Sequence, residues 1–177
     1  PQQACDDRSK ACSLLQSMVD AQLQAPEELM EVNECLDDLL TLLRLHVEDP
    51  LSWKVAAFGS AVNGFGSSGS DIDAVAYQDL AVGQRAKDAR SVLRSLQEPL
   101  NRSDAFSVRQ LVTGARVPIM KLRYKGLRDV DLSVNNTSPL PNTRLLKAYA
   151  GFGKCVVDFG VSVKLWAKNW QLCGAAV

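Results

Sequence analysis

The sequence is poor in the residues that build zinc sites and disulfide frameworks. It has one histidine, His46, and its five cysteines include no C-x-x-C pair. Because both kinds of structure need clustered cysteine or histidine ligands, the sequence argues against each. This use of cysteine fits a reducing compartment, so we expect an intracellular protein, with the cytoplasm favoured and the nucleus and mitochondrion left open. We expect His46 to be a surface residue in the last turn of a helix rather than a catalytic group.

Long apolar runs are also absent. None approaches the roughly 20 residues that a membrane-spanning helix requires, so no membrane partner is expected. The chain starts at Pro1 rather than at methionine, and residues 173–177 carry no helix stop signal, so we expect a fragment of a longer protein. With 177 residues, 46% of them apolar, the chain is long enough for one domain with a substantial core and part of a second.

The net charge is zero, but the two parts of the chain carry opposite charge. Residues 1–49 hold 11 acidic and 3 basic residues, a balance of −8, whereas residues 50–177 hold 9 acidic and 17 basic residues, a balance of +8. An acidic segment attached to a basic body accompanies polyanion binding in some proteins. A solvated acidic helix would give the same pattern, so both interpretations stay open.

Hydrophobic periodicity predicts helices at both ends of the chain and a mixture of strands and helices between them. The predicted helices cover residues 9–25, 26–47, 83–98, 144–150 and 157–172, with a further short helix after Ser60. The predicted strands cover residues 54–58, 72–77, 106–113, 117–124 and 129–134. Asn142 and Thr143 are expected to cap the helix that starts at Arg144.

This order of elements predicts an α+β fold, in which a mixed α/β sheet with flanking helices is followed by the start of a helical domain. The polar, proline-bearing stretch 135–141 suggests a domain boundary. We expect an N-terminal helical segment at residues 1–49, a catalytic domain at 50–136 and the truncated start of a helical nucleotide-binding domain at 137–177.

A turn rich in glycine and serine stands before two aspartates in the middle of the chain. A strand ending at Phe58 enters Gly59-Ser60, and Asp71-Ile72-Asp73 opens the next strand. Because side chains alternate along a strand, both aspartates point to one side and Ile72 points into the core. Such a composition alone is typical of a flexible linker. Its place between two apolar strands instead favours a functional turn whose backbone N–H groups can face phosphates.

Paired carboxylates repel each other unless a cation lies between them, and hard oxygen ligands suit Mg²⁺. A two-metal phosphoryl-transfer site also needs a third carboxylate. Asp129 and Asp131 are the candidates, and Asp131 would reach the same metals if its strand lies beside the one that starts at Ile72. The sequence thus predicts nucleotidyl transfer, in which one metal activates the attacking hydroxyl and the other holds the triphosphate.

The motifs, taken in order, resemble a known superfamily. Gly59-Ser60, ten further residues and Asp71-Ile72-Asp73 resemble the signature of the DNA polymerase beta nucleotidyltransferases, with Val130-Asp131-Leu132 as the third-carboxylate strand. Later motifs resemble one branch, the non-canonical poly(A) polymerases and terminal uridylyltransferases. These motifs are Val134-Asn135-Asn136, Asn142-Thr143-Arg144-Leu145-Leu146 and Val163-Lys164-Leu165-Trp166-Ala167-Lys168. The resemblance covers roughly residues 50–173.

The resemblance implies a palm-like domain and a template-independent RNA 3′-terminal nucleotidyltransferase. Such an enzyme transfers AMP or UMP from ATP or UTP to an RNA 3′-hydroxyl and releases pyrophosphate. The implied ligands of two Mg²⁺ ions, with Mn²⁺ as an alternative, are Asp71, Asp73 and Asp131. The implied nucleotide contacts are Gly59 and Ser60 with the triphosphate, Asn142 and Thr143 with the ribose and base edge, and Lys164 and Lys168 with the phosphates.

The sequence departs from the family in two places. Gly153 and Cys155 stand where the family often has an acidic-x-Arg pair, so that ion pair is expected to be absent or replaced, with Asp158 as the candidate. The chain also stops before the Ser-Tyr pair that stacks on the base, so we expect the fragment alone to be inactive.

Two other hypotheses stay open. One is a catalytically inactive nucleotidyltransferase-like module that binds RNA or protein, which loss of an aspartate would favour, although all three are present. The other is a small-molecule nucleotidyltransferase or an oligoadenylate-type synthase, which the later motifs argue against. RNA would be held through backbone-type charge contacts, although most of the candidate side chains are expected to be simply solvated. The candidates are Arg85, Lys87, Arg90, Arg94, Arg102, Arg109, Arg116, Lys121, Arg123, Lys125 and Arg128.

Overall fold

A computed structural model describes residues 2–81 and 83–172, without the side chains of residues 2–9 and 11. The predicted lack of a helix stop at residues 173–177 lies outside the described residues. The α-helices are α1 (Gln2–Asp20), α2 (Pro26–His46), α3 (Ala89–Arg102), α4 (Pro139–Ala150) and α5 (Lys154–Asn169), and a short 3-10 helix, η1, covers Pro50–Ser52. The strands are β1 (Trp53–Phe58), β2 (Ile72–Gln78), β3 (Phe106–Val112), β4 (Ile119–Tyr124) and β5 (Arg128–Val134).

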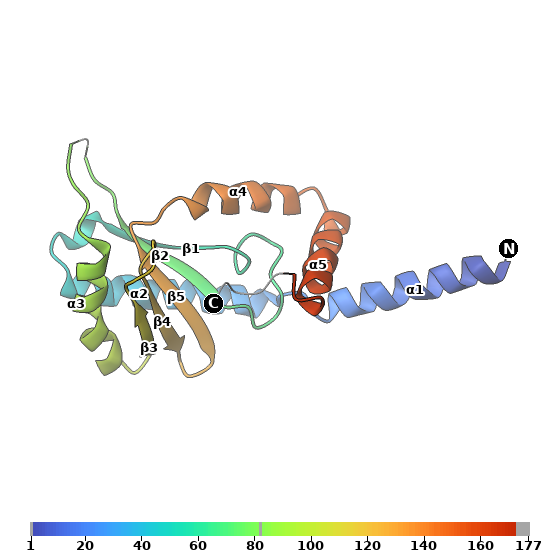
Figure 1. The fold of residues 1–177 in the computed structure, drawn as a ribbon, viewed down its shortest axis with the longest axis horizontal. Coiled ribbons are helices and arrows are strands. Elements are labelled where there is room, and N and C mark those ends of the chain that lie inside the picture. The colour runs from blue at the N-terminus through green and yellow to red at the C-terminus, as the bar shows by residue number, and fades with distance from the viewer. Residues whose placement is uncertain (1, 82, 173–177) are drawn as a thin grey trace.

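The five strands form one mixed sheet in the order β1-β2-β5-β4-β3. The pair β2 and β5 is parallel, whereas β1 with β2, β4 with β5 and β3 with β4 are antiparallel. The chain therefore leaves the sheet after β2, forms α3 and the β3–β4 hairpin, and returns to place β5 directly beside β2 (Figure 1). The predicted α+β fold with a mixed sheet is confirmed.

The core lies between one face of the sheet and the helices α2 and α3. Strand β4 shows how the sequence selects this face, since Met120, Leu122 and Tyr124 are buried while Lys121 between them is exposed. Side chains of α2 and α3, such as Leu39 and Leu93, complete the same apolar cluster. We call the opposite face of the sheet the open face.

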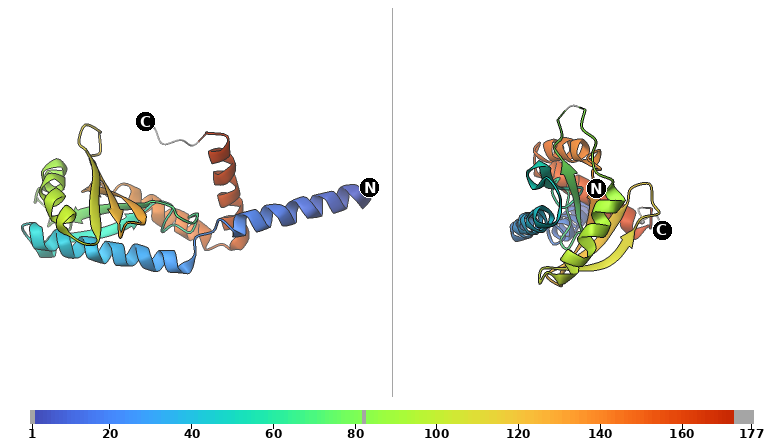
Figure 2. Two further views of the ribbon diagram at one scale, coloured as in Figure 1. Left: turned by 90° about the horizontal axis from the view of Figure 1, so that it is seen from below. Right: turned by 90° about the vertical axis from the view of Figure 1, so that its left-hand side faces the viewer.

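Helices α1, α4 and α5 lie outside the core. Helix α2 runs alongside the sheet, and α1 projects beyond it, away from the strands (Figure 2). The C-terminal helix α5 contacts α1 and α4, and α4 also contacts β1. Pro26 in the first turn and Arg44 and His46 in the last turn mark the ends of α2 as the sequence predicts, and His46 is exposed. The division of the chain at residues 49 and 136 stays a prediction.

Four of the six acidic side chains of α2 are paired within the protein, namely Glu28, Glu31, Glu34 and Asp38. Their spacing of three to four residues places them along one side of the helix. The partners come from the end of β4, the turn after it and the start of β5. Lys125 Nζ lies 2.8 Å from Glu34, and the Tyr124 hydroxyl donates to Asp38 over 2.7 Å. The opposite charges of the two parts of the chain therefore bind the helix to the sheet.

Arg128 is the more buried of the two basic partners, with 8% of its side chain exposed, against 49% for Lys125. Its Nη2 lies 2.7 Å from Glu28 and 3.0 Å from Glu31, and its Nη1 donates to the Ser70 carbonyl over 3.2 Å. Burial raises the pKa of Glu28, but hydrogen bonds from Arg128, the Gly69 amide and the Ser68 hydroxyl outweigh it and lower that pKa to about 2. These bonds fix the segment directly before Asp71 against α2.

Two helix predictions need correction. No helix follows Ser60, because Gly59, Gly64 and Gly69 all have positive φ and the described segment between them forms turns and bends. Helix α3 begins at Ala89 rather than at residue 83, because the Asp88 side chain accepts from the Ser91 amide and caps it there. Arg85 and Lys87 are therefore not on this helix.

The other helix boundaries shift without changing the order of elements. Helix α1 covers residues 2–20 instead of 9–25, and α5 covers 154–169 instead of 157–172. Helix α4 starts at Pro139, so the predicted capping role of Asn142 and Thr143 is wrong, and both lie inside the helix. In the described part of the chain, none of the helices combines the length and the apolar character that crossing a membrane would need.

Replacing Arg128 with methionine should lower the free energy of unfolding by about 3 kcal/mol, because two largely buried carboxylates lose their partner. Lys125→Met is the matched control, since it removes a half-exposed ion pair to the same helix and should cost less than about 1 kcal/mol. Urea unfolding monitored by circular dichroism measures both. Equal losses of unfolding free energy would show that the ion pairs of Arg128 contribute no more than an exposed ion pair.

Candidate active site

The parallel pairing of β2 and β5 sets two of the predicted carboxylates side by side. Asp73 and Asp131 are direct partners in the register of these strands. Side chains of register partners point to the same face, here the open face, because Ile72 and Leu132 next to them are buried in the core. Asp71 lies immediately before β2 and is exposed. The chain thus brings the three predicted aspartates to one edge of the open face.

Repulsion between neighbouring carboxylates contributes to a raised pKa at Asp73 and at Asp131. Burial raises the pKa of Asp73 to about 6, and the negative charges of Asp131 and Asp71 add to this effect. Burial also raises the pKa of Asp131, but the nearby Lys121 ammonium opposes the rise. The cluster therefore carries a negative charge that a cation would relieve.

Three carboxylates form a donor set that suits a hard divalent cation such as Mg²⁺. Within residues 2–81 and 83–172, however, no three acidic, cysteine or histidine side chains converge closely enough to hold a metal ion. The donor set therefore suits a metal in its chemistry, but holding one would require these side chains to move closer together.

The turn after β1 contacts the carboxylates through its backbone. Gly59 has a φ of +73°, and a Cβ added to it would lie 2.7 Å from Oδ2 of Asp73. A side chain at this position would therefore be strained by the backbone and would also displace the carboxylate. Ser60 follows, half-buried, at the first bend of the turn.

Thr143 joins helix α4 to this turn. Its side chain is nearly buried, its Oγ1 donates to the Pro139 carbonyl over 2.9 Å, and the Gly59 amide donates to the same Oγ1 over 3.0 Å. Thr143 therefore bridges two elements instead of capping a helix, and its predicted contact with a nucleotide stays a prediction. Asn142, the residue before it, is exposed.

Helix α5 approaches the other side of the turn. Lys164 Nζ donates to the Phe65 carbonyl over 3.4 Å, and Gly160 lies so close that an added Cβ would be 2.6 Å from the Phe65 ring. Burial lowers the pKa of Lys164, and the charge of Lys168 one helical turn away lowers it further. Lys168 is exposed. The two lysines therefore share a helix face beside the turn, as their spacing predicts.

Two other expectations concern side chains outside the carboxylate cluster. Asp158 pairs with Lys154 over 2.8 Å, so this part of the chain does contain an ion pair. That it takes the place of the family's acidic-x-Arg pair stays a prediction. Asn135, quoted above as part of a family motif, accepts from the Gln78 amide and donates to the Lys87 carbonyl. It therefore anchors the end of β2 rather than facing the carboxylates.

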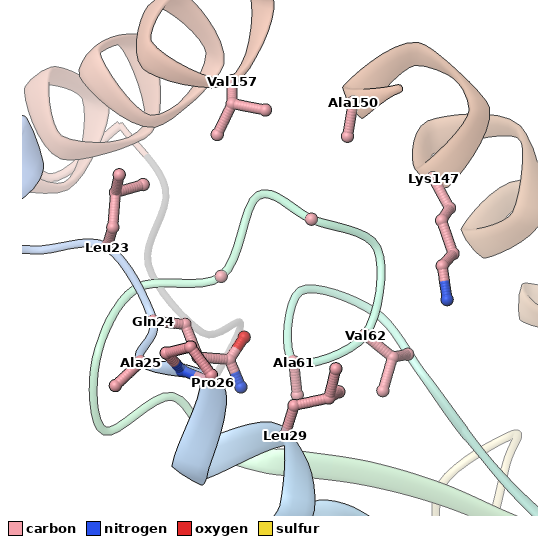
Figure 3. Close-up of a pocket in the computed structure, with 12 residues that line it drawn as sticks. Leu23, Gln24, Ala25, Pro26, Leu29, Ala61, Val62, Lys147, Ala150 and Val157 are labelled. Carbon is pink, nitrogen blue, oxygen red and sulfur yellow. The ribbon is translucent and has the colours of Figure 1, made fainter. Parts of the chain in front are cut away.

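A cavity of about 550 Å³ lies behind the turn, between the α1–α2 corner and helices α4 and α5 (Figure 3). Leu23 and Pro26 line it from the corner, Ala61 and Val62 from the turn, and Val157 from α5. None of the predicted site residues lines this cavity. Its lining is largely apolar, and it is separate from the carboxylate cluster.

Sequence reasoning gave no site role to the residues that hold the turn in place. Buried Asn63 accepts from the Phe65 amide over 2.9 Å, and Glu28 binds the Gly69 amide over 3.0 Å. The sequence contains no signal for these contacts, because they depend on how the turn folds over the start of α2. Lys121, by contrast, carries a signal: it is the charged residue between two apolar ones on a predicted strand.

Asp73→Asn should stabilise the metal-free protein at neutral pH. The folded-state pKa of about 6 lies above the unfolded value near 3.8, so charging Asp73 costs stability as pH rises from about 4 to 6, and this cost stays constant above 6. Each pKa unit corresponds to about 1.4 kcal/mol, and partial exposure reduces the gain to about 1–2 kcal/mol. Thermal melting of both proteins in the presence of a chelator, at pH 4 and at pH 7, measures this difference in stability. An asparagine variant less stable than wild type at pH 7 would contradict this repulsion.

Gly59→Ala should lower the free energy of unfolding by more than backbone strain alone would, because the added methyl group meets the Asp73 carboxylate. Gly126 provides a matched control, since its φ is also +73° and nothing lies within 4 Å of an added Cβ. Gly126→Ala should cost about 1–2 kcal/mol, and Gly59→Ala should exceed it. Melting temperatures compare the two, and equal losses would show that the close approach to Asp73 has no consequence.

Comparison with known proteins agrees with this geometry. Residues 11–151 match the family model described as "Poly(A) RNA polymerase, mitochondrial-like, central palm domain". The poly(A) RNA polymerase GLD2 of Danio rerio is 36% identical over 118 residues, which cover 66% of this chain and 24% of that protein. The human terminal uridylyltransferase 4 is 30% identical over 125 residues, which cover 70% of this chain and 8% of that protein. The chain thus spans a quarter or less of these relatives.

Solved structures show the same fold. A structure of the GLD-2/RNP-8 complex matches 92% of this chain and 50% of the solved chain, with a TM-score of 0.77 at 25% identity. A structure of mtPAP in complex with UTP matches 93% of this chain and 38% of the solved chain, with a TM-score of 0.79 at 20% identity. With the family match over residues 11–151, the predicted resemblance is confirmed: the chain belongs to the palm-domain family of the mitochondrial-like poly(A) RNA polymerases, whose relatives include poly(A) polymerases and terminal uridylyltransferases.

Proposed function

We propose that the protein to which this chain belongs is a template-independent RNA 3′-terminal nucleotidyltransferase that uses ATP or UTP. The observation that carries the proposal is the register pairing of Asp73 with Asp131 on the open face, with Asp71 just before β2. The names of the relatives, poly(A) RNA polymerase and terminal uridylyltransferase, support the same reaction and both nucleotides. We place the protein inside the cell, with the cytoplasm favoured over the nucleus and the mitochondrion.

In this proposal Asp71, Asp73 and Asp131 hold two divalent ions, Mg²⁺ or alternatively Mn²⁺. Bound there, the ions would supply activation of the RNA 3′-hydroxyl and charge neutralisation of the triphosphate and the departing pyrophosphate. No covalent intermediate with the chain is needed. Because the raised pKa of Asp73 reflects burial and repulsion, the carboxylates gain most from a cation when all three are ionised.

The remaining site residues bind and orient the nucleotide. The backbone of Gly59 and the Ser60 hydroxyl face the triphosphate, and Lys164 and Lys168 neutralise it from α5 as point charges. Asn142 and Thr143 contact the ribose and base edge. The Gly59 amide already donates to Thr143, so α4 and the turn are held together before a nucleotide binds between them. Segments of the protein outside this chain would complete the nucleotide site.

Asp131→Asn in the full-length protein should reduce extension of an RNA primer by at least about a hundredfold, because the third carboxylate is lost while the fold remains. Asp129→Asn is the matched control: it lies on the same strand, is exposed, and pairs with Arg123 instead of facing Asp73. Primer extension with Mg²⁺, offering each ribonucleoside triphosphate separately, measures the loss and the base choice.

Undiminished extension by the Asp131 variant would overturn the site assignment. A wild-type protein that binds RNA but extends it with none of the four nucleotides would instead support a catalytically inactive binding module.

A further inference from the structure

Lys121 stands beside the carboxylate cluster and is named above only as one of eleven basic side chains that could contact the RNA backbone, with no specific role. It lies between buried Met120 and Leu122 on β4, so its side chain is on the open face. The register pairs it with Asp131, which in turn pairs with Asp73. One cation and two carboxylates therefore form a row across three adjacent strands. Strands are spaced about 4.8 Å apart, so Lys121 is about one strand from Asp131 and about two from Asp73.

The contact between Lys121 and Asp131 is present but loose. The Nζ atom lies 3.9 Å from Oδ2 of Asp131, and 47% of the lysine side chain is exposed. Among the residues that the structure describes, no other lysine or arginine forms an ion pair with Asp71, Asp73 or Asp131.

The other basic side chains of β4, of the turn after it and of the start of β5 have partners of their own. Arg123, two residues along β4, binds Asp129 over 3.0 Å and the Leu127 carbonyl over 3.3 Å. Lys125 binds Glu34, and Arg128 is buried between two carboxylates of α2. Of these four side chains, Lys121 is therefore the one that can bind a new anionic partner while losing the weakest existing contact.

An RNA chain that presents its 3′-hydroxyl to these carboxylates brings a second negative group with it. The phosphodiester that links the last two nucleotides must lie within one nucleotide of the hydroxyl, next to a cluster that repels it. A cation on the neighbouring strand offsets that repulsion and gives the phosphate a fixed partner.

We propose that Lys121 is a positioning residue that binds the terminal phosphodiester of the RNA and orients the 3′-hydroxyl toward Asp131. This inference rests on the proposed function, since it assumes that RNA is the substrate at the carboxylates. In the absence of RNA, the loose pair with Asp131 holds the ammonium over the site. When RNA enters, the ammonium exchanges one anionic oxygen for another without leaving the open face.

The test uses the full-length protein with Lys121→Met, Lys121→Arg and the control Lys54→Met. Lys54 is a strand lysine of similar exposure that pairs with Asp79 beyond the other end of the row. Binding of a single-stranded RNA oligonucleotide is measured by fluorescence anisotropy without nucleotide at several salt concentrations. Steady-state kinetics then give KM separately for the RNA and for the nucleotide.

Lys121→Met should weaken RNA binding and raise the KM for RNA by about tenfold, as expected for the loss of one charge-assisted contact. The slope of log K against log salt should shrink by about 0.7, the contribution of one phosphate contact on a single strand. The nucleotide KM should stay within about twofold. Lys121→Arg should restore most of the affinity, and Lys54→Met should behave as wild type.

The assignment is overturned if Lys121→Met leaves the salt slope and RNA affinity unchanged, even if it lowers the melting temperature, because Lys121 would then be structural. It is also overturned if the nucleotide KM rises as much as the RNA KM. Wild-type protein that binds RNA with a Lys121-dependent slope but transfers no nucleotide would refute the proposed function and leave the phosphate contact standing. If the protein transfers nucleotides but Lys121→Met has no effect on RNA binding, the proposed function stands and the phosphate contact is refuted.

Discussion

The buried ion pair between Arg128 and Glu28 is the interaction on which the site depends. It connects three parts of the chain that lie far apart in the sequence: the start of α2, the segment that leads into Asp71, and the start of β5. An isolated pair of this kind contributes little net stability, because desolvation offsets the attraction. What it contributes here is position. The same guanidinium that bonds to α2 also bonds to the Ser70 carbonyl, one residue before the first carboxylate.

A second constraint acts at the other end of the turn, where there is no room for a side chain. The backbone of Gly59 approaches the Asp73 carboxylate, and its amide is fixed by Thr143 of α4. The turn rich in glycine and serine is thus attached to α2 by Glu28, to α4 by Thr143 and to α5 by Lys164 and Phe65. A composition that is typical of flexible linkers is held here by contacts to three helices.

The sequence was sufficient to predict a mixed sheet and the approximate positions of its five strands. It left the strand order open, and with it whether Asp131 lies beside Asp73. Period-two alternation around Ile72, Lys121 and Asp131 predicts which side chains share a face, because that rule is local. It could not predict that α4 begins at Pro139, since Thr143 looks like a cap but bonds to Pro139 and Gly59. Nor could it predict the absence of a helix after Ser60. Both depend on contacts between segments far apart in the chain, which no local pattern contains.

The parallel pairing of β2 with β5 also governs when the site comes into existence. Asp73 and Asp131 are 58 residues apart in the chain (131 − 73), and α3 and the β3–β4 hairpin lie between them. Closing so long a segment into a parallel pair is slow, because the entropy of loop closure is lost before the pairing is gained. The carboxylates therefore meet only once the sheet is complete. A ligand that requires both will bind the native protein and not its partly folded forms, so its binding free energy adds directly to the stability of the finished fold.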